Sequence, residues 1–137
     1  MPHAKTLLWL LLPLLLLSAC RERLADTRWV LTEIVGKEIP VSGRAYMRLH
    51  EDGEKVVAGS GGCNRFSGPY TLDGNALRVG PLIATRMACP DMREERAFFT
   101  ALQTADAYRL EQGTLVLSRG GAPLLRFRAE APAGGAE

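Results

Sequence analysis

Side chains that commonly bind metals or carry out acid–base chemistry are scarce in this sequence. The 137 residues include two histidines and three cysteines, and no two cysteines have the Cys-x-x-Cys spacing. Of the two histidines, only His50 lies beyond the first twenty residues. A zinc site normally needs three or four Cys, His or carboxylate ligands. We therefore expect no metal site and no other cofactor.

A strong excess of one charge is also absent. The chain has 17 Lys and Arg against 15 Asp and Glu, a net charge of +2, while domains that bind nucleic acid normally show a clear basic excess. Hydrophobic residues make up 47% and charged residues 23%, as in ordinary globular proteins. The composition excludes a disordered, collagenous or coiled-coil chain, argues against nucleic acid as a partner and fits a single domain.

No apolar run is long enough to cross a membrane. The uncharged run from Leu7 to Leu17 includes Pro13, and as a helix it would span about 16 Å of a hydrocarbon core of about 30 Å. A basic start followed by a short apolar run is typical of a secretory signal. The end of the run, Leu17-Ser18-Ala19-Cys20, resembles the lipobox of bacterial lipoproteins. We interpret 1–19 as a lipoprotein signal peptide and Cys20 as the lipidated residue; the alternative is a plain signal peptide, which Leu17 fits badly.

Lipid on Cys20 would attach the chain to a membrane. Residues 20–26 would form a linker, and the stretch from Arg21 to Thr27 reaches at most about 24 Å. Many inner-membrane lipoproteins have Asp where this chain has Arg21, and this resemblance favours the outer membrane. We expect a protein of the bacterial cell envelope that faces the periplasm.

The other two cysteines, Cys63 and Cys89, would then lie outside the cytosol. An even pair in an exported chain typically forms a disulfide, which for a loop of this length contributes about 3 to 4 kcal/mol in the chain-entropy model. Two buried free thiols and a reactive or metal-binding pair are the alternatives.

Short strands separated by tight turns account for most of the remaining chain. Alternating apolar residues and Asp-Gly turns such as Asp52-Gly53 and Asp73-Gly74 predict antiparallel strands. We expect strands at 27–35, 45–50, 55–58, 68–72, 76–79, 82–87, 108–111, 114–118 and 124–128. In the first strand, Trp29, Leu31 and Glu33 would share one face.

One segment, from Asp91 to Ala105, lacks both Gly and Pro and predicts a helix. Asp91 and Glu94 would form a capping box, and a buried stripe would consist of Phe98, Phe99, Leu102 and Ala105. The fold class that follows is mainly β (α+β), a curved antiparallel or barrel-like sheet with one packed helix. We expect the domain at 27–129 and a disordered tail at 130–137.

Two motifs resemble the META domain family. The first follows the pattern G-C-N-x-F-x-G-x-Y and the second T-x-M-x-C, and the match extends over about Leu24 to Arg128. The first motif consists of Gly62, Cys63, Asn64, Phe66, Gly68 and Tyr70, and the second of Thr85, Met87 and Cys89. The chain is also similar to HslJ-like heat-shock lipoproteins of the bacterial envelope.

The resemblance implies a non-catalytic domain connected with envelope stress. The residues agree, because the glycine-rich stretch at Ser60 lacks the Lys-Ser/Thr ending of a phosphate loop and the first Gly of a nucleophile elbow. We expect no enzyme, but a monomer that contacts an unidentified envelope protein. The alternatives are a carrier of a small ligand inside the sheet and an inhibitor of a hydrolase. The motif residues themselves have two interpretations, a folding device or a binding site.

Overall fold

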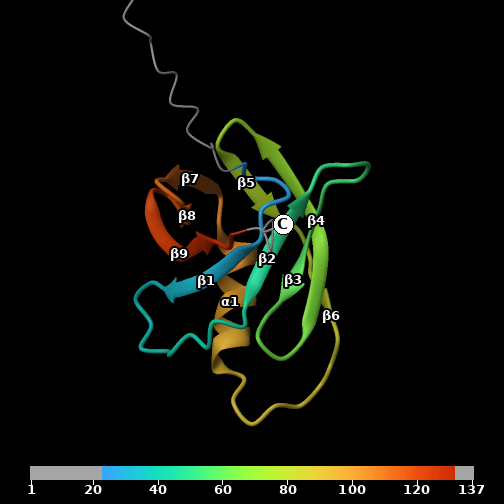
Figure 1. The fold of residues 1–137 in the computed structure, drawn as a ribbon, viewed down its shortest axis with the longest axis vertical. Helices are drawn as coiled ribbons and strands as arrows, with labels where there is room; N and C mark the ends of the chain where they lie inside the picture. Colours follow the sequence, from blue (N-terminus) through green and yellow to red (C-terminus); the bar gives the residue numbers. More distant parts are fainter. Residues whose placement is uncertain (1–22, 132–137) are drawn as a thin grey trace, which may run out of the picture.

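The structure, a computed structural model, describes residues 23–131 (Figure 1). The signal peptide expected at 1–19, Cys20 and most of the expected tail lie outside these residues. The described elements, in chain order, are β1 (Trp29–Ile34), β2 (Tyr46–His50), β3 (Val56–Ser60), β4 (Arg65–Asp73), β5 (Ala76–Val79), β6 (Ile83–Ala84), α1 (Arg93–Thr104), β7 (Ala107–Glu111), β8 (Thr114–Arg119) and β9 (Ala122–Ala129).

These strands form an antiparallel sheet in the order β5-β4-β3-β2-β1-β9-β8-β7, with β6 paired to β4. The sheet curls until its two ends meet: the Leu77 N–H donates to the Asp106 carbonyl (3.2 Å), and the Tyr108 N–H donates to the Asn75 carbonyl (3.0 Å). The result is a nearly closed barrel-like sheet with one helix (Figure 1), which confirms the expected fold class.

The long strand β4 has two neighbours on one side. Phe66 and Ser67 pair with β6, whereas the stretch from Tyr70 to Asp73 pairs with β5. Pro69, which has no N–H to donate, lies between the two. The expected strand at 82–87 shortens to β6, and after one further backbone hydrogen bond, from the Thr85 N–H to the Arg65 carbonyl, the chain leaves the sheet.

The faces of β1 differ from the expectation. Trp29 and Leu31 are buried, but Glu33 is exposed and pairs with Arg126 (3.0 Å), while Ile34 is buried. A register shift between Leu31 and Glu33 in the pairing with β9 is the cause, because one extra residue reverses the alternation beyond it.

The helix packs its apolar face into the interior of the barrel-like sheet. Phe98 and Leu102 are fully buried, and the Phe98 ring lies 5.7 Å from that of Phe66 on β4 and 5.9 Å from that of Phe127 on β9. Phe98 therefore bridges strands from both halves of the sheet. Among residues 23–131, these side chains occupy the space inside the sheet in which a carried ligand would have to lie.

The expected capping box does not form. The N-cap residue is Met92, without a side-chain cap; Asp91 Oδ1 accepts a hydrogen bond from the Arg93 N–H (3.0 Å). The Glu94 carboxylate turns away and accepts one from the Ser42 N–H (3.0 Å). Glu94 therefore binds the β1–β2 connection instead of capping the helix.

The folded chain begins earlier than the boundary expected at 27. Leu24 and Ala25 are buried, and the Trp29 indole donates to the Leu24 carbonyl (2.9 Å). At the other end, the Glu130 N–H donates to the Arg28 carbonyl (2.9 Å), so ordered contacts reach the first residue of the expected tail. Within residues 23–131, no helix combines the length and the apolar character needed to cross a membrane.

Candidate functional site

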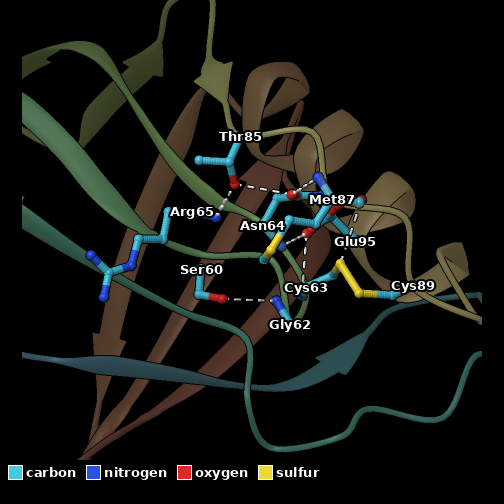
Figure 2. Close-up of a disulfide and its surroundings, with 9 residues drawn as sticks. All are labelled: Ser60, Gly62, Cys63, Asn64, Arg65, Thr85, Met87, Cys89 and Glu95. Carbon is cyan, nitrogen blue, oxygen red and sulfur yellow. Dashed lines mark hydrogen bonds between the residues drawn. A yellow bond between two sulfur atoms is a disulfide. The ribbon is translucent and has the colours of Figure 1, made fainter.

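The two sequence motifs meet at one end of the barrel, where the turn before β4 lies against the connection from β6 to α1 (Figure 2). Cys63 and Cys89, the pair expected to be oxidised, are joined by a disulfide with a Cα–Cα distance of 6.3 Å. We call the group of Cys63, Asn64, Thr85, Met87, Cys89 and Glu95 the polar corner.

Asn64 is the centre of the polar corner, and it is 3% exposed. Its Oδ1 accepts hydrogen bonds from the Met87 N–H (2.7 Å) and the Thr85 hydroxyl (2.9 Å). Its Nδ2 donates to the Met87 carbonyl (3.2 Å) and to Glu95 Oε2 (2.8 Å). One side chain thereby binds both polar groups of the Met87 backbone, which resembles the pairing between two strands.

Glu95 is a buried carboxylate that serves the turn before β4. Its Oε1 accepts hydrogen bonds from the backbone N–H groups of Asn64 (2.6 Å) and Cys63 (3.3 Å). In the described part of the chain it forms no ion pair with Lys or Arg, so its charge is balanced by hydrogen-bond donors alone. Glu95 thus fastens α1 to the first motif.

Two glycines of the first motif have conformational reasons for their place. Gly62 has φ +108°, a value that side chains other than that of Gly rarely allow. A Cβ on Gly68 would lie 2.8 Å from both the Leu82 side chain and the Pro81 carbonyl oxygen. These glycines let the turn form and let the connection after β5 approach β4.

The aromatic residues of the first motif anchor β4 in the core. Phe66 is buried against Phe98 and Phe99, and the Tyr70 hydroxyl donates to the His50 carbonyl (3.1 Å). Burial raises the pKa of Tyr70, and the nearby charges of Glu51 and Asp26 raise it further. Both residues have structural roles.

The segment from Ile83 to Ala88 presents its side chains to solvent while its backbone is held. Ile83 is 75% exposed and Met87 58% exposed. Thr85 pairs with Arg65 through both backbone and side chain, because its N–H donates to the Arg65 carbonyl (3.0 Å) and its hydroxyl accepts from the Arg65 N–H (3.1 Å). The backbone of this segment is therefore fixed by the disulfide, by Asn64 and by β4, while its side chains face solvent.

All nine motif residues therefore belong to one folded unit, with most of them at the polar corner. The sequence did not predict that Glu95 would be its buried acceptor. The available signal was position: Glu95 precedes Phe98 by three residues and Leu102 by seven, which places it on the apolar face of the helix.

The arrangement offers little chemistry of its own. Among residues 23–131, no group of three or more His, Cys, Asp or Glu side chains is placed to hold a metal ion. Asp91, whose pKa is lowered to about 2, owes the shift first to its side-chain hydrogen bond with Arg93, and its side chain is exposed. What the corner does is hold a backbone in place.

Comparison with known proteins agrees with the motifs. The family model of the META domain matches residues 22–131, so the chain belongs to the META domain family. No curated protein matches the chain.

Three solved structures have a similar fold. A protein from Burkholderia xenovorans, solved by NMR, is 26% identical, with 80% of this chain and 85% of that one covered and a TM-score of 0.63. Another NMR structure is 24% identical over 74% and 87%, with a TM-score of 0.57. A crystal structure of a DUF4847 family protein from Bacteroides vulgatus is 15% identical over 77% and 93%, with a TM-score of 0.54. The last two likenesses show the fold alone.

Proposed function

We propose that this META domain protein is a non-catalytic, lipid-anchored component of the bacterial cell envelope that acts in the stress response by contacting another protein. The lipobox ending at Cys20 supports the anchor, and the resemblance to HslJ-like lipoproteins supports the stress role. The observation that carries the proposed contact is the exposed Ile83–Ala88 segment.

Exposed apolar side chains on a rigid backbone are typical of a binding surface. Ile83 and Met87 are two of the three large hydrophobic side chains that stand exposed among residues 23–131; the third is Leu110. The polar corner already fixes the backbone of this segment. Binding to a partner would therefore cost little of the segment's conformational entropy.

The charges around the segment indicate the chemistry of the partner. The sequence from Ala76 to Pro90 contains no acidic residue and includes Arg78 and Arg86. Arg65 lines a cavity of about 390 Å³ beside Met87, and no carboxylate lies within ion-pair distance of its side chain in the described residues. An apolar surface bordered by arginines fits a partner surface that combines apolar and acidic side chains.

The described chain begins at the upper end of the barrel in Figure 1, whereas the β6–α1 connection runs below the lower end. With an anchor near the first end, the segment would face away from the membrane. This orientation supports a partner in the periplasm rather than the lipid surface that holds the anchor.

A photo-crosslinking amino acid in place of Met87, in intact cells, tests the contact. Because the Met87 backbone makes the bonds to Asn64, the replacement keeps the fold, and we expect one crosslinked envelope protein. The matched control is the same amino acid in place of Ala76, which is exposed on β5. Identical bystanders at both positions, or none, would contradict the proposal.

The anchor is tested separately by the mass of the mature N-terminus, where a diacylglycerol thioether on Cys20 is expected. A free or uncleaved terminus would refute the anchor. It would not affect the protein contact, which the crosslinking experiment tests by itself. If the crosslinked partner is a hydrolase, its activity with and without the protein distinguishes an inhibitor from a structural contact.

A further inference from the structure

A second, separate surface lies on the side of α1 that faces the β1–β2 connection. There a groove of about 480 Å³ opens between the helix, the end of β1 and the start of β9. Ile34 belongs to the core, and Ile39, Ala97, Ala101 and Leu124 pack against it. The floor of the groove is therefore apolar and is formed by partly buried side chains at the edge of the core.

The groove exists because the helix carries small side chains on this side. Ala97 and Ala101 lie one turn apart on α1, so their methyl groups face the same side, next to the interior face with Phe98 and Leu102. A larger pair of side chains would reach the β1–β2 connection and fill the space.

Part of the opposite wall is held in place by internal main-chain hydrogen bonds. The Val35 N–H donates to the Leu124 carbonyl (2.9 Å), and the Lys37 N–H donates to the Ile34 carbonyl (3.2 Å). The Ser42 N–H is bound by Glu94 (3.0 Å). These three donors are used internally, and the side chains that line the groove on this side include Val35, Ile39 and Leu124, whose apolar surface suits an alkyl chain.

The charges at the groove have one sign. Lys37, Arg93 and Arg96 line it, and no acidic residue does. Arg93 is paired with Asp91 (2.8 Å), but no carboxylate lies within ion-pair distance of Lys37 or Arg96 among residues 23–131. An anion above the apolar floor would find two cations without a partner.

We propose that this groove binds a single-chain amphiphile with an anionic headgroup. The alkyl chain lies along Ile39, Ala97 and Ala101, and the headgroup lies at Lys37 and Arg96. The volume falls in the range of about 300–1,000 Å³ that is typical of small-molecule sites. The headgroup is a carboxylate or a phosphate, as in a fatty acid or a lysophospholipid.

The test uses a photoactivatable C12 fatty acid below its micellar concentration and the full chain in nanodiscs of neutral phosphatidylcholine. We expect saturable labelling of the peptides that contain Ala97–Thr104 and Ile39. The isosteric C12 alcohol should label these peptides at least tenfold less, because it lacks the charge.

Two variants locate the site. The double variant Ala97→Leu/Ala101→Leu fills the groove and should reduce labelling at least fivefold, while its matched control Ala76→Leu leaves it unchanged. Lys37→Glu/Arg96→Glu should reduce labelling about tenfold, while Arg78→Glu, on the exposed side of β5, should not. Thermal unfolding of each variant checks that the fold is retained, and a variant that has lost it is replaced by the single Ala101→Leu or Arg96→Glu change.

Labelling that persists in the filled groove, or equal labelling by acid and alcohol, would overturn the proposal. Competition distinguishes the two sources: displacement of the probe by lysophosphatidylglycerol at lower concentration than by dodecanoate assigns a phosphate headgroup, and the reverse order assigns a carboxylate. Failure of both to compete at concentrations that saturate the probe would also overturn it.

Discussion

The interior of the barrel and the polar corner hold the same fold by different means. In the interior, fully buried side chains such as Trp29, Phe98 and Phe127 exclude water. In the polar corner, Asn64 and Glu95 are buried as well, but they bind backbone groups of neighbouring segments through hydrogen bonds. Apolar burial brings the elements together without fixing a direction, whereas the polar corner fixes one segment in one position.

This difference explains how the Ile83–Ala88 segment is kept in place. Apolar burial could hold it only by covering Ile83 and Met87, which would remove them from any partner. Hydrogen bonds from Asn64 to the Met87 backbone, and the disulfide of Cys63 and Cys89, hold the segment and leave its side chains exposed. The two regions should therefore respond differently to mutation.

The largest loss of stability is expected from the interior. Phe98→Ala should lower the free energy of unfolding by about 3–5 kcal/mol, because it removes a fully buried ring and leaves a cavity. Urea unfolding followed by circular dichroism measures the change. Leu110→Ala, at an exposed position, should cost less than about 1 kcal/mol, and equal losses for the two variants would contradict the described core.

Removal of the disulfide is expected to cost slightly less. For cysteines 26 residues apart, the chain-entropy model gives a loss of about 3 to 4 kcal/mol in Cys63→Ser/Cys89→Ser. Urea unfolding of this variant measures the loss. We also expect the Met87 amide to lose more protection from hydrogen exchange than the amides of β8 and β9, whose exchange should speed up only by the measured loss of global stability. An equal loss of protection at all of these amides would mean that the bridge supports the whole barrel rather than the corner.

Removal of the Asn64 side-chain amide should lower the free energy of unfolding by less than removal of the disulfide. Asn64→Ala leaves Glu95 Oε2 and the Met87 N–H without partners, and we expect a loss of about 2 kcal/mol, because unsatisfied buried groups cost about 1–3 kcal/mol each and water reaches part of this site. Urea unfolding at pH 7 measures it.

Asn64→Asp sharpens this test. It keeps the acceptor for Met87 but places an oxygen where Nδ2 now donates to Glu95. The variant should be destabilised at neutral pH and recover relative to the native chain as the pH falls, since one proton between the two carboxyls restores a donor. A pH-independent difference would mean that Glu95 does not depend on that donor.

The smallest effect is expected at the exposed pair of Asp91 and Arg93. The hydrogen bond from Arg93 lowers the pKa of Asp91 to about 2, so the ionised carboxylate contributes to stability above its ordinary pKa of about 3.9, and the contribution is lost as the pH falls through about 2. An NMR titration should show the midpoint moving back toward about 3.9 in Arg93→Gln. An unchanged midpoint would assign the shift to the helix end instead.

The sequence was sufficient to predict the local elements. Alternation and Asp-Gly turns located the hairpins, and the absence of Gly and Pro between Asp91 and Ala105 located the helix. These signals depend on neighbouring residues, so they can be read along the chain. The even pair of cysteines in a chain with an export signal likewise indicated that Cys63 and Cys89 would meet.

Features that depend on contacts distant in sequence were not predictable in this way. The register shift in β1 depends on how β9 pairs with it, and the expectation for Glu33 was wrong for that reason. Glu94 was expected to cap its own helix, but Ser42, fifty-two residues earlier, offers its N–H instead. The fixed backbone of Met87 likewise becomes visible only when Asn64 is placed beside it.

The burial of Leu24 leaves very little slack between the barrel and Cys20. Its carbonyl is bound by the Trp29 indole, so three residues, Arg21 to Arg23, span the gap and reach about 10 Å when fully extended. If the chain is attached to the membrane by the anchor that we propose, so short a tether would restrict how far the barrel can reorient above the bilayer. Which way it points would be decided by where the chain enters the core.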